Sequence, residues 1–85
     1  METIVRNPGR GKIVEGLVRV IHREGALPAA ALHDRLWAIG LRMSRHEVFG
    51  ALSYAEGQCL IASVPHAFNG NRVRAYYYLL DAGSG

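Results

Sequence analysis

Apolar side chains recur with helical spacing in the first half of the chain. Between Arg10 and about Glu24 they follow the i, i+4, i+7, i+8 pattern of one helix face, formed by Ile13, Leu17, Val20 and Ile21. Val14 and Val18 add a second, adjacent stripe. The pattern predicts a helix that is buried on two sides and ends at Gly25, because glycine takes the left-handed conformation of a helix end at little cost.

A second helix is predicted to begin near Pro28, because proline suits the first helical turn, and to break at Gly40. Its inward side chains would be Leu32, Leu36 and Ile39. A one-bridge strand at Ala26-Leu27 is compatible with the residues that precede this helix. A short connector, residues 41–43, follows it.

A third helix is predicted from Ser44 to about Glu56 or Gly57. Ser44 and Glu47 have the spacing of a capping box, in which each side chain accepts a hydrogen bond from the other residue's backbone N–H. The inward face of this helix would consist of Val48, Ala51, Leu52 and Ala55.

The pattern changes after the third helix. The apolar run Leu60–Val64 has little helical period, and Asn69-Gly70 is a dipeptide typical of two-residue hairpin turns. Residues 72–80 alternate, with Val73, Ala75, Tyr77 and Leu79 on one face and Arg72, Arg74, Tyr76 and Tyr78 on the other. The sequence therefore predicts two strands that are joined by a basic loop.

Helices followed by strands, rather than alternating with them, predict the α+β class. The chain of 85 residues supplies one domain, which we expect to comprise a flexible N-terminal arm (1–9), a folded part (10–80) and a disordered tail (81–85). The single cysteine excludes an intrachain disulfide, and no apolar run approaches the roughly 18 residues of a membrane span. The N-terminus lacks the pattern of a signal peptide, so we expect a cytoplasmic protein.

The formal net charge is +3, and nine of the ten basic residues are arginine. Arginine carries a planar fork of donors that suits phosphates and guanine edges. A GC-rich genome would encode the same bias, so the positions of the arginines are more informative than their number.

The order of these features resembles the winged helix-turn-helix family. The resemblance is carried by VIHREGALPAAAL (20–32), by Leu36, Gly40 and Leu41, by MSRHEVFGAL (43–52) and by GQCLI (57–61), and it spans residues 13 to about 80. It implies that the third helix lies in the major groove of double-stranded DNA and that the hairpin is a wing on the flanking backbone. The implied protein is a transcriptional, plasmid- or phage-type regulator.

On this resemblance the first turn of the third helix would meet base edges. The implied base-reading residues are Ser44, Arg45, His46 and Phe49, the last through a thymine methyl group. The implied contacts to the DNA backbone are Arg42, Asn69, Asn71, Arg72 and Arg74, with Arg10 and Lys12 at the basic entry to the first helix.

Two alternatives stay open. The outward positions later in the third helix carry few polar groups for a DNA reader, and they fit an adaptor that docks on another protein without binding DNA; they are Phe49, Gly50, Ser53 and Tyr54. A homodimer is the other alternative. Its candidate dimer or partner surface is Val14, Val18, Trp37, Tyr54, Tyr76 and Tyr78, although ordinary packing also explains Trp37, Tyr76 and Tyr78.

No combination of residues points to catalysis. The four histidines and Cys59 are scattered singly, without the Cys-x-x-Cys or His-x-x-x-His spacing of a metal site. Cys59 stands at the entry to a predicted core strand, where cysteine is usually a small buried hydrophobe. The segment Gly9–Lys12 lacks the spacing of a phosphate loop. We therefore expect no metal, no cofactor, no small-molecule ligand and no enzymatic activity.

Overall fold

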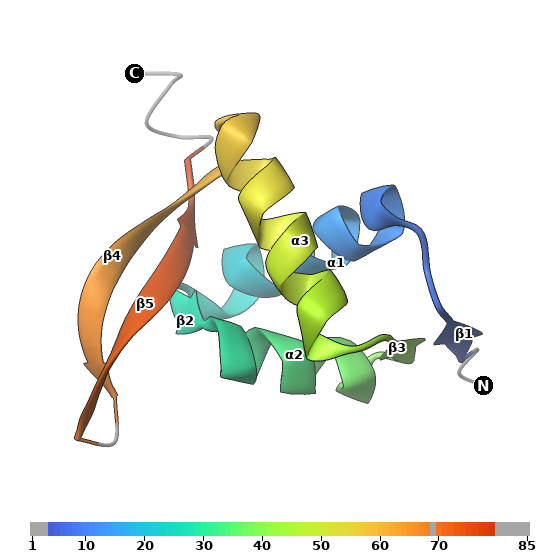
Figure 1. The fold of residues 1–85 in the computed structure, drawn as a ribbon, viewed down its shortest axis with the longest axis horizontal. Coiled ribbons are helices and arrows are strands. Elements are labelled where there is room, and N and C mark those ends of the chain that lie inside the picture. Colours follow the sequence, from blue (N-terminus) through green and yellow to red (C-terminus); the bar gives the residue numbers. More distant parts are fainter. Residues whose placement is uncertain (1–3, 69, 80–85) are drawn as a thin grey trace.

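The computed structural model describes residues 4–68 and 70–79. In this part of the chain the elements are β1 (Val5–Arg6), α1 (Arg10–Glu24), β2 (Leu27–Pro28), α2 (Ala29–Ala38), β3 (Leu41–Arg42), α3 (Arg45–Gly57), β4 (Ile61–Phe68) and β5 (Asn71–Tyr78). Figure 1 shows the helices packed together, with the β4–β5 hairpin extending on one side and β1 and β3 at the opposite end. The prediction of a mixed α+β domain with three helices is confirmed. No described helix has the length and apolar character needed to cross a membrane.

The ends of the helices have local causes. The last turn of α1 carries His22 and Arg23, where positive charge is favoured by the helix dipole. The helix ends at Gly25, as predicted, with a φ of 90° that suits glycine, and the Gly25 N–H bonds the Ile21 carbonyl at 2.7 Å. α2 starts directly after Pro28. Pro28 is the N-cap of this helix, and its backbone is extended.

The core lies where the helices meet the sheet, and most of the predicted inward residues fill it. Each of the following is at most 3% exposed: Ile13, Leu17, Val20, Ile21, Leu32, Leu36, Val48, Ala51, Leu52 and Ala55. The expectation for Ile39 is wrong, because this side chain is 37% exposed. α2 ends one residue earlier, at Ala38, so Ile39 has already left the helical face.

The hairpin prediction is confirmed. β4 and β5 pair antiparallel from Ile61 with Tyr78 to Phe68 with Asn71, so residues 69 and 70 join the strands. Gly70 has a φ of 78°, which a tight hairpin turn requires. The first strand runs further than expected, to Phe68. Asn69 and residues 81–85, the expected tail, lie outside the described residues.

β5 is the central strand of a sheet in the order β2-β5-β4. β2 pairs with β5 at Leu27 and Pro28, one residue later than the bridge expected from the sequence. The face of β5 that carries Tyr76 and Tyr78 turns toward the helices, since Tyr76 is 7% exposed and Tyr78 packs against the core. The register explains this choice: Tyr78 pairs with Ile61, which is itself 1% exposed, and alternate residues of a strand share a side.

The segment expected to be a flexible arm contains a short strand that the sequence analysis missed. β1 pairs in parallel with β3. The Val5 N–H bonds the Gly40 carbonyl at 2.7 Å, and the Asn7 N–H bonds the Arg42 carbonyl at 2.9 Å. A strand of two residues has too little alternation to be read from sequence. The pairing ties the segment before α1 to the connector that leads into α3.

Candidate nucleic-acid interface

The first turn of α3 has a fixed backbone and exposed side chains. Ser44 Oγ accepts a hydrogen bond from the Glu47 N–H at 3.2 Å, and the Glu47 carboxylate accepts one from the Ser44 N–H at 3.1 Å, so the predicted capping box is present. Arg45 and His46 follow, both exposed. Arg45 forms no ion pair with any described residue. The turn therefore presents a guanidinium and an imidazole, whereas the Ser44 hydroxyl is already engaged by the cap.

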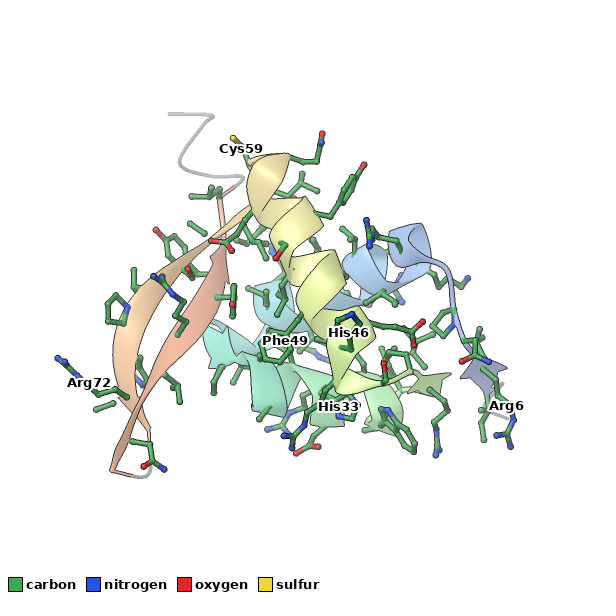
Figure 2. All side chains as sticks on the ribbon, viewed as in Figure 1. Arg6, His33, His46, Phe49, Cys59 and Arg72 are labelled. Atoms are coloured by element: carbon green, nitrogen blue, oxygen red, sulfur yellow. The ribbon has the colours of Figure 1, made fainter. Side chains whose placement is uncertain are left out.

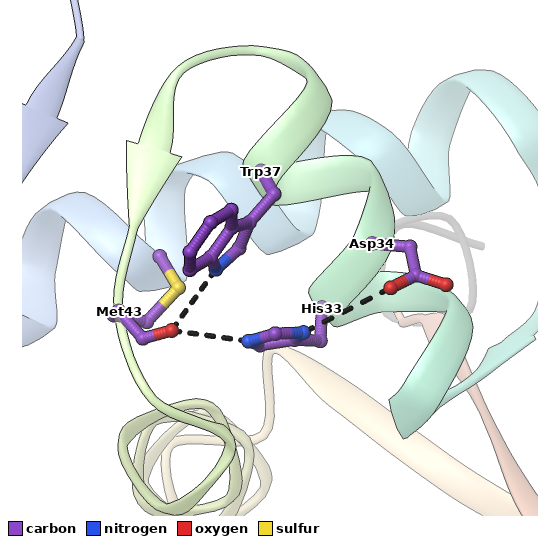
Figure 3. Close-up of polar contacts among 4 residues, drawn as sticks. All are labelled: His33, Asp34, Trp37 and Met43. Atoms are coloured by element: carbon purple, nitrogen blue, oxygen red, sulfur yellow. Dashed lines mark hydrogen bonds and ion pairs between the residues drawn. The ribbon is translucent and has the colours of Figure 1, made fainter.

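Two side chains of α2 hold the residue that precedes this turn (Figure 3). His33 Nε2 and Trp37 Nε1 both donate to the Met43 carbonyl oxygen, each at 3.0 Å. His33 Nδ1 lies 3.9 Å from the Asp34 carboxylate. Because Met43 comes directly before the N-cap, these bonds determine where α3 starts relative to α2. This role is not visible in the sequence, because the partners are 10 and 6 residues apart and no periodic pattern connects them.

Arg42 stacks on Trp37. The guanidinium carbon lies 4.6 Å from the centroid of the Trp37 ring, a distance at which the cation is attracted to the ring face. Arg42 is half-buried, and its Nε is buried with no hydrogen-bond partner among the described residues. Arg42 was expected on the DNA backbone and Trp37 on a partner surface. The structure gives both of them a packing role beside the start of α3.

Phe49 lies one turn after Arg45, and its side chain is 52% exposed. Figure 2 shows the ring on the side of α3 that faces the hairpin. A small hollow of about 40 Å³ beside it is lined by Ala29, Ala30, His33, Arg45, Val48 and Phe49. A larger one of about 380 Å³ is lined by Pro28, Ala29, Ala30, Phe49, Val73, Arg74 and Tyr76. A largely apolar floor therefore leads from the first turn of α3 to the hairpin.

Arg10 flanks the other side of the exposed face of α3. Its guanidinium carbon lies 5.8 Å from the centroid of the Tyr54 ring, and a Cβ placed on Gly50 would lie 3.3 Å from an Arg10 terminal nitrogen. Lys12 points elsewhere, because successive helical residues are rotated by about 100°. It lines a separate hollow of about 320 Å³ between α1 and the β1–β3 end of the molecule, together with Glu15, Arg19 and Arg23. The fold thus separates two basic residues that the sequence analysis placed together.

The hairpin carries two arginines with different surroundings. Arg74 Nη1 donates to Ser63 Oγ at 2.9 Å, and Ser63 Oγ donates to Glu56 Oε2 at 3.1 Å, so Arg74 is linked to α3 through Ser63. Arg72 is exposed near the turn, and Figure 2 shows it pointing away from the helices. It has no ion pair within the described residues. Asn71 is exposed beside it.

Tyr76 lies on β5, where the hairpin joins the core, and its side chain is 7% exposed. Burial raises the pKa of Tyr76, and the negative charge of Glu56 raises it further, whereas Arg74 acts in the opposite direction. The phenol is therefore neutral at ordinary pH and contributes no charge next to the hairpin arginines.

Only some residues of the predicted dimer or partner surface are exposed in the structure. Val14 and Tyr76 are 8% and 7% exposed, so the expectation that they form such a surface is wrong. α1 packs against α2, α3 and β5, which covers its first apolar stripe and Val14 of the second. Val18 and Tyr78 are half-buried and pack against the core. Trp37 and Tyr54 keep the most exposure, at 40% and 45%.

Cys59 is exposed, contrary to the expectation of a buried hydrophobe (Figure 2). It follows the C-cap of α3 with a φ of 60°, and its N–H bonds the Glu56 carbonyl at 3.0 Å. The chain reverses here to leave the helix, and β4 begins two residues later, at Ile61. Among the residues that the structure describes, no three His, Cys, Asp or Glu side chains are grouped as metal ligands would be.

Comparison with known proteins shows a similar fold. No protein-family model matches the chain, and no curated protein matches it. The structure is similar to that of Stf76 from the Sulfolobus islandicus plasmid-virus pSSVx, with a TM-score of 0.65 at 14% sequence identity. The match covers 84% of this chain and 92% of Stf76. The two chains therefore share a small fold over most of their lengths.

Proposed function

We propose that the protein is a winged helix-turn-helix domain that binds double-stranded DNA sequence-specifically, as a transcriptional, plasmid- or phage-type regulator without enzymatic activity. In this proposal α2 and α3 form the helix-turn-helix, α3 enters the major groove, and the β4–β5 hairpin is the wing. The observation that carries it is the first turn of α3. Arg45 and His46 are exposed there on a backbone that is held by the capping box and by the two hydrogen bonds to Met43.

The distribution of charge supports a phosphate-lined partner. Arg45 stands at the start of α3, Arg10 lies against its flank, and Arg72 extends from the hairpin. By contrast, Arg35 is paired with Glu24 at 2.9 Å, and this carboxylate raises the pKa of Arg35. A duplex supplies phosphates on both sides of the groove that α3 would occupy, so cations beside the helix and on the hairpin would neutralise them.

The proposal assigns different roles to the arginines. Arg45 would donate two hydrogen bonds to the O6 and N7 atoms of a guanine, the commonest specific contact in the major groove. Arg72 and Arg10 would contact phosphates, which position the domain without reading sequence. Arg74 would contribute less, because its guanidinium already donates to Ser63.

The test measures binding to a pool of random duplex DNA by fluorescence anisotropy, at low and at moderate salt. The duplexes that bind are then selected and sequenced. Binding should weaken with salt by a log–log slope of about −0.9 per phosphate contact, and one discrete site should be enriched. Arg45→Ala should cost about 1–3 kcal/mol at that site and much less on random DNA. Arg72→Ala should weaken all duplexes alike and reduce the salt slope by about 1.

Arg19→Ala is the matched control, since it removes the same charge from a hollow that no residue of α3 or of the hairpin lines. Its effect should be smaller than that of either test variant on every duplex. Equal losses on the selected and random duplexes for Arg45→Ala would refute the base-reading role. A chain that binds no duplex even at low salt would refute the proposed function.

The apolar hollow of about 380 Å³ favours a second candidate function, an adaptor that docks on another protein. Its walls are mostly aliphatic and aromatic, and the exposed ring of Phe49 stands at its edge. An apolar interface of this kind would respond little to salt, whereas phosphate binding responds steeply. Sedimentation of the purified chain over a range of concentrations tests the case in which the partner is a second copy.

A further inference from the structure

The small hollow beside α3 places apolar side chains next to Arg45, the residue that is proposed to read a base. Its volume is about 40 Å³, and Arg45 and Phe49 both line it. About 10–15 Å³ of space for the centre of a water-sized sphere is enough to hold one water molecule, so a hollow of this size accommodates one small group such as a methyl. The remaining walls are mostly apolar and come from Ala29, Ala30 and Val48, with His33 at one side.

Base edges in the major groove offer very few apolar groups. Guanine, cytosine and adenine present hydrogen-bond donors and acceptors there, and thymine adds the methyl group on C5. A polar base edge against the Phe49 ring would lose its water without gaining a new partner, which is unfavourable. A methyl group in the same place would be removed from water with a gain in free energy.

We propose that Phe49 and this hollow read the C5-methyl group of a pyrimidine that neighbours the guanine bound by Arg45. The inference rests on the proposed function, because it needs α3 in the major groove. Arg45 and Phe49 are four residues apart, and therefore lie on the same side of α3 in successive turns. Since Arg45 itself lines the hollow, the guanine and the methylated base would be adjacent in the stack, about 3.4 Å apart.

The methyl group has two chemical sources, thymine and 5-methylcytosine, and the experiment separates them. It starts from the duplex that the random-pool selection enriches. Each thymine is replaced in turn by deoxyuridine, which keeps the base pair and removes the methyl group alone. In a second series the thymine–adenine pair is replaced by a cytosine–guanine pair, with the cytosine either plain or 5-methylated. Dissociation constants are measured by fluorescence anisotropy.

The wild-type protein should lose about fourfold in affinity at one thymine position, the factor expected for one buried methyl group, and little at the others. At that position 5-methylcytosine should bind about fourfold more tightly than cytosine. Phe49→Ala should remove both differences. Phe49→Leu, which keeps an apolar wall, should retain them.

Ile39→Ala is the matched control, because Ile39 is an exposed apolar residue at the end of α2, outside the hollow. It should keep the full methyl dependence, and thermal melting of each variant checks that it is folded. Methyl dependence that is absent at every position, or unchanged in Phe49→Ala, overturns the inference while leaving duplex binding in place. A protein that binds no duplex at all overturns the proposed function itself, so the two failures are distinguishable.

Discussion

Gly16 is the point in α1 at which a single added methyl group would meet the core. A Cβ placed there would lie 2.8 Å from Leu36 Cδ2 and 2.9 Å from Leu41 Cδ1. Carbon atoms pack best at about 3.5–4.0 Å, so both leucine methyl groups would have to move. Leu36 is 0% and Leu41 8% exposed, which leaves them little room. The contact also matters for the site, because β3, which contains Leu41, leads into the N-cap of α3.

Two opposing contributions determine the effect of Gly16→Ala. Replacing a glycine inside a helix by alanine is favourable by up to about 1 kcal/mol. Adding a methyl group to a well-packed core costs about 1–3 kcal/mol, and the upper part of this range applies because two buried side chains must move. We therefore expect Gly16→Ala to lower the free energy of unfolding by about 1–2 kcal/mol.

Gly11→Ala is the control in the same helix, since no atom lies within 4 Å of a Cβ at that position. Only the helix preference acts there, so we expect stabilisation by up to about 1 kcal/mol. Thermal unfolding followed by far-UV circular dichroism measures both variants. A change of 1 kcal/mol shifts the Tm of a domain of this size by about 4–8 °C, which is easily resolved. A Gly16→Ala protein as stable as the wild type or more so would refute the close packing of α1 on Leu36 and Leu41.

Two further predictions concern the cap of α3 and the tyrosine at the base of the hairpin. Ser44→Ala should lower the free energy of unfolding by about 0.5–2 kcal/mol in urea, because the Glu47 N–H loses its acceptor. Ser53→Ala, exposed on the same helix, should change it by less than about 0.5 kcal/mol, and equal losses would contradict the role of the cap. Because burial raises the pKa of Tyr76, the folded state favours the neutral phenol; this stability is complete below the unfolded pKa of about 10 and is lost as pH rises through the folded pKa. The free energy of unfolding, measured in urea at increasing alkaline pH, should therefore fall less steeply for Tyr76→Phe than for the wild type. Identical pH profiles of the two proteins would refute a contribution of the Tyr76 phenol.

The candidate interface was only partly visible in the sequence. Arg45, His46 and Phe49 were identified because they follow a capping signal that sets the helix phase, and all three are exposed. The contacts around them come from other elements: Arg10 reaches Tyr54 and Gly50 from the start of α1. Such contacts depend on how α1 crosses α3, and the crossing is a property of packed side chains.

The hydrogen bonds from His33 and Trp37 to the Met43 carbonyl, and the stacking of Arg42 on Trp37, were not predicted for a related reason. Their partners belong to α2 and to the connector after it, and the chain must turn at Gly40 before they meet. Polar residues at unrelated spacings carry no periodic signal. Trp37, for which both a partner surface and ordinary packing were open, donates a hydrogen bond to the Met43 carbonyl and remains 40% exposed.

Local signals in the sequence were sufficient for the elements whose hydrogen bonds lie within a few residues. The end of α1 at Gly25, the Ser44–Glu47 cap and the hairpin turn at Gly70 depend on neighbouring residues alone, so the sequence predicts them. Long-range choices required the folded chain. The alternation in β5 shows two faces, but the pairing of Tyr78 with the buried Ile61 decided which face turns inward. Alternation identifies the two faces of a strand, but which of them packs on the helices depends on how the sheet docks on the helices in the folded chain.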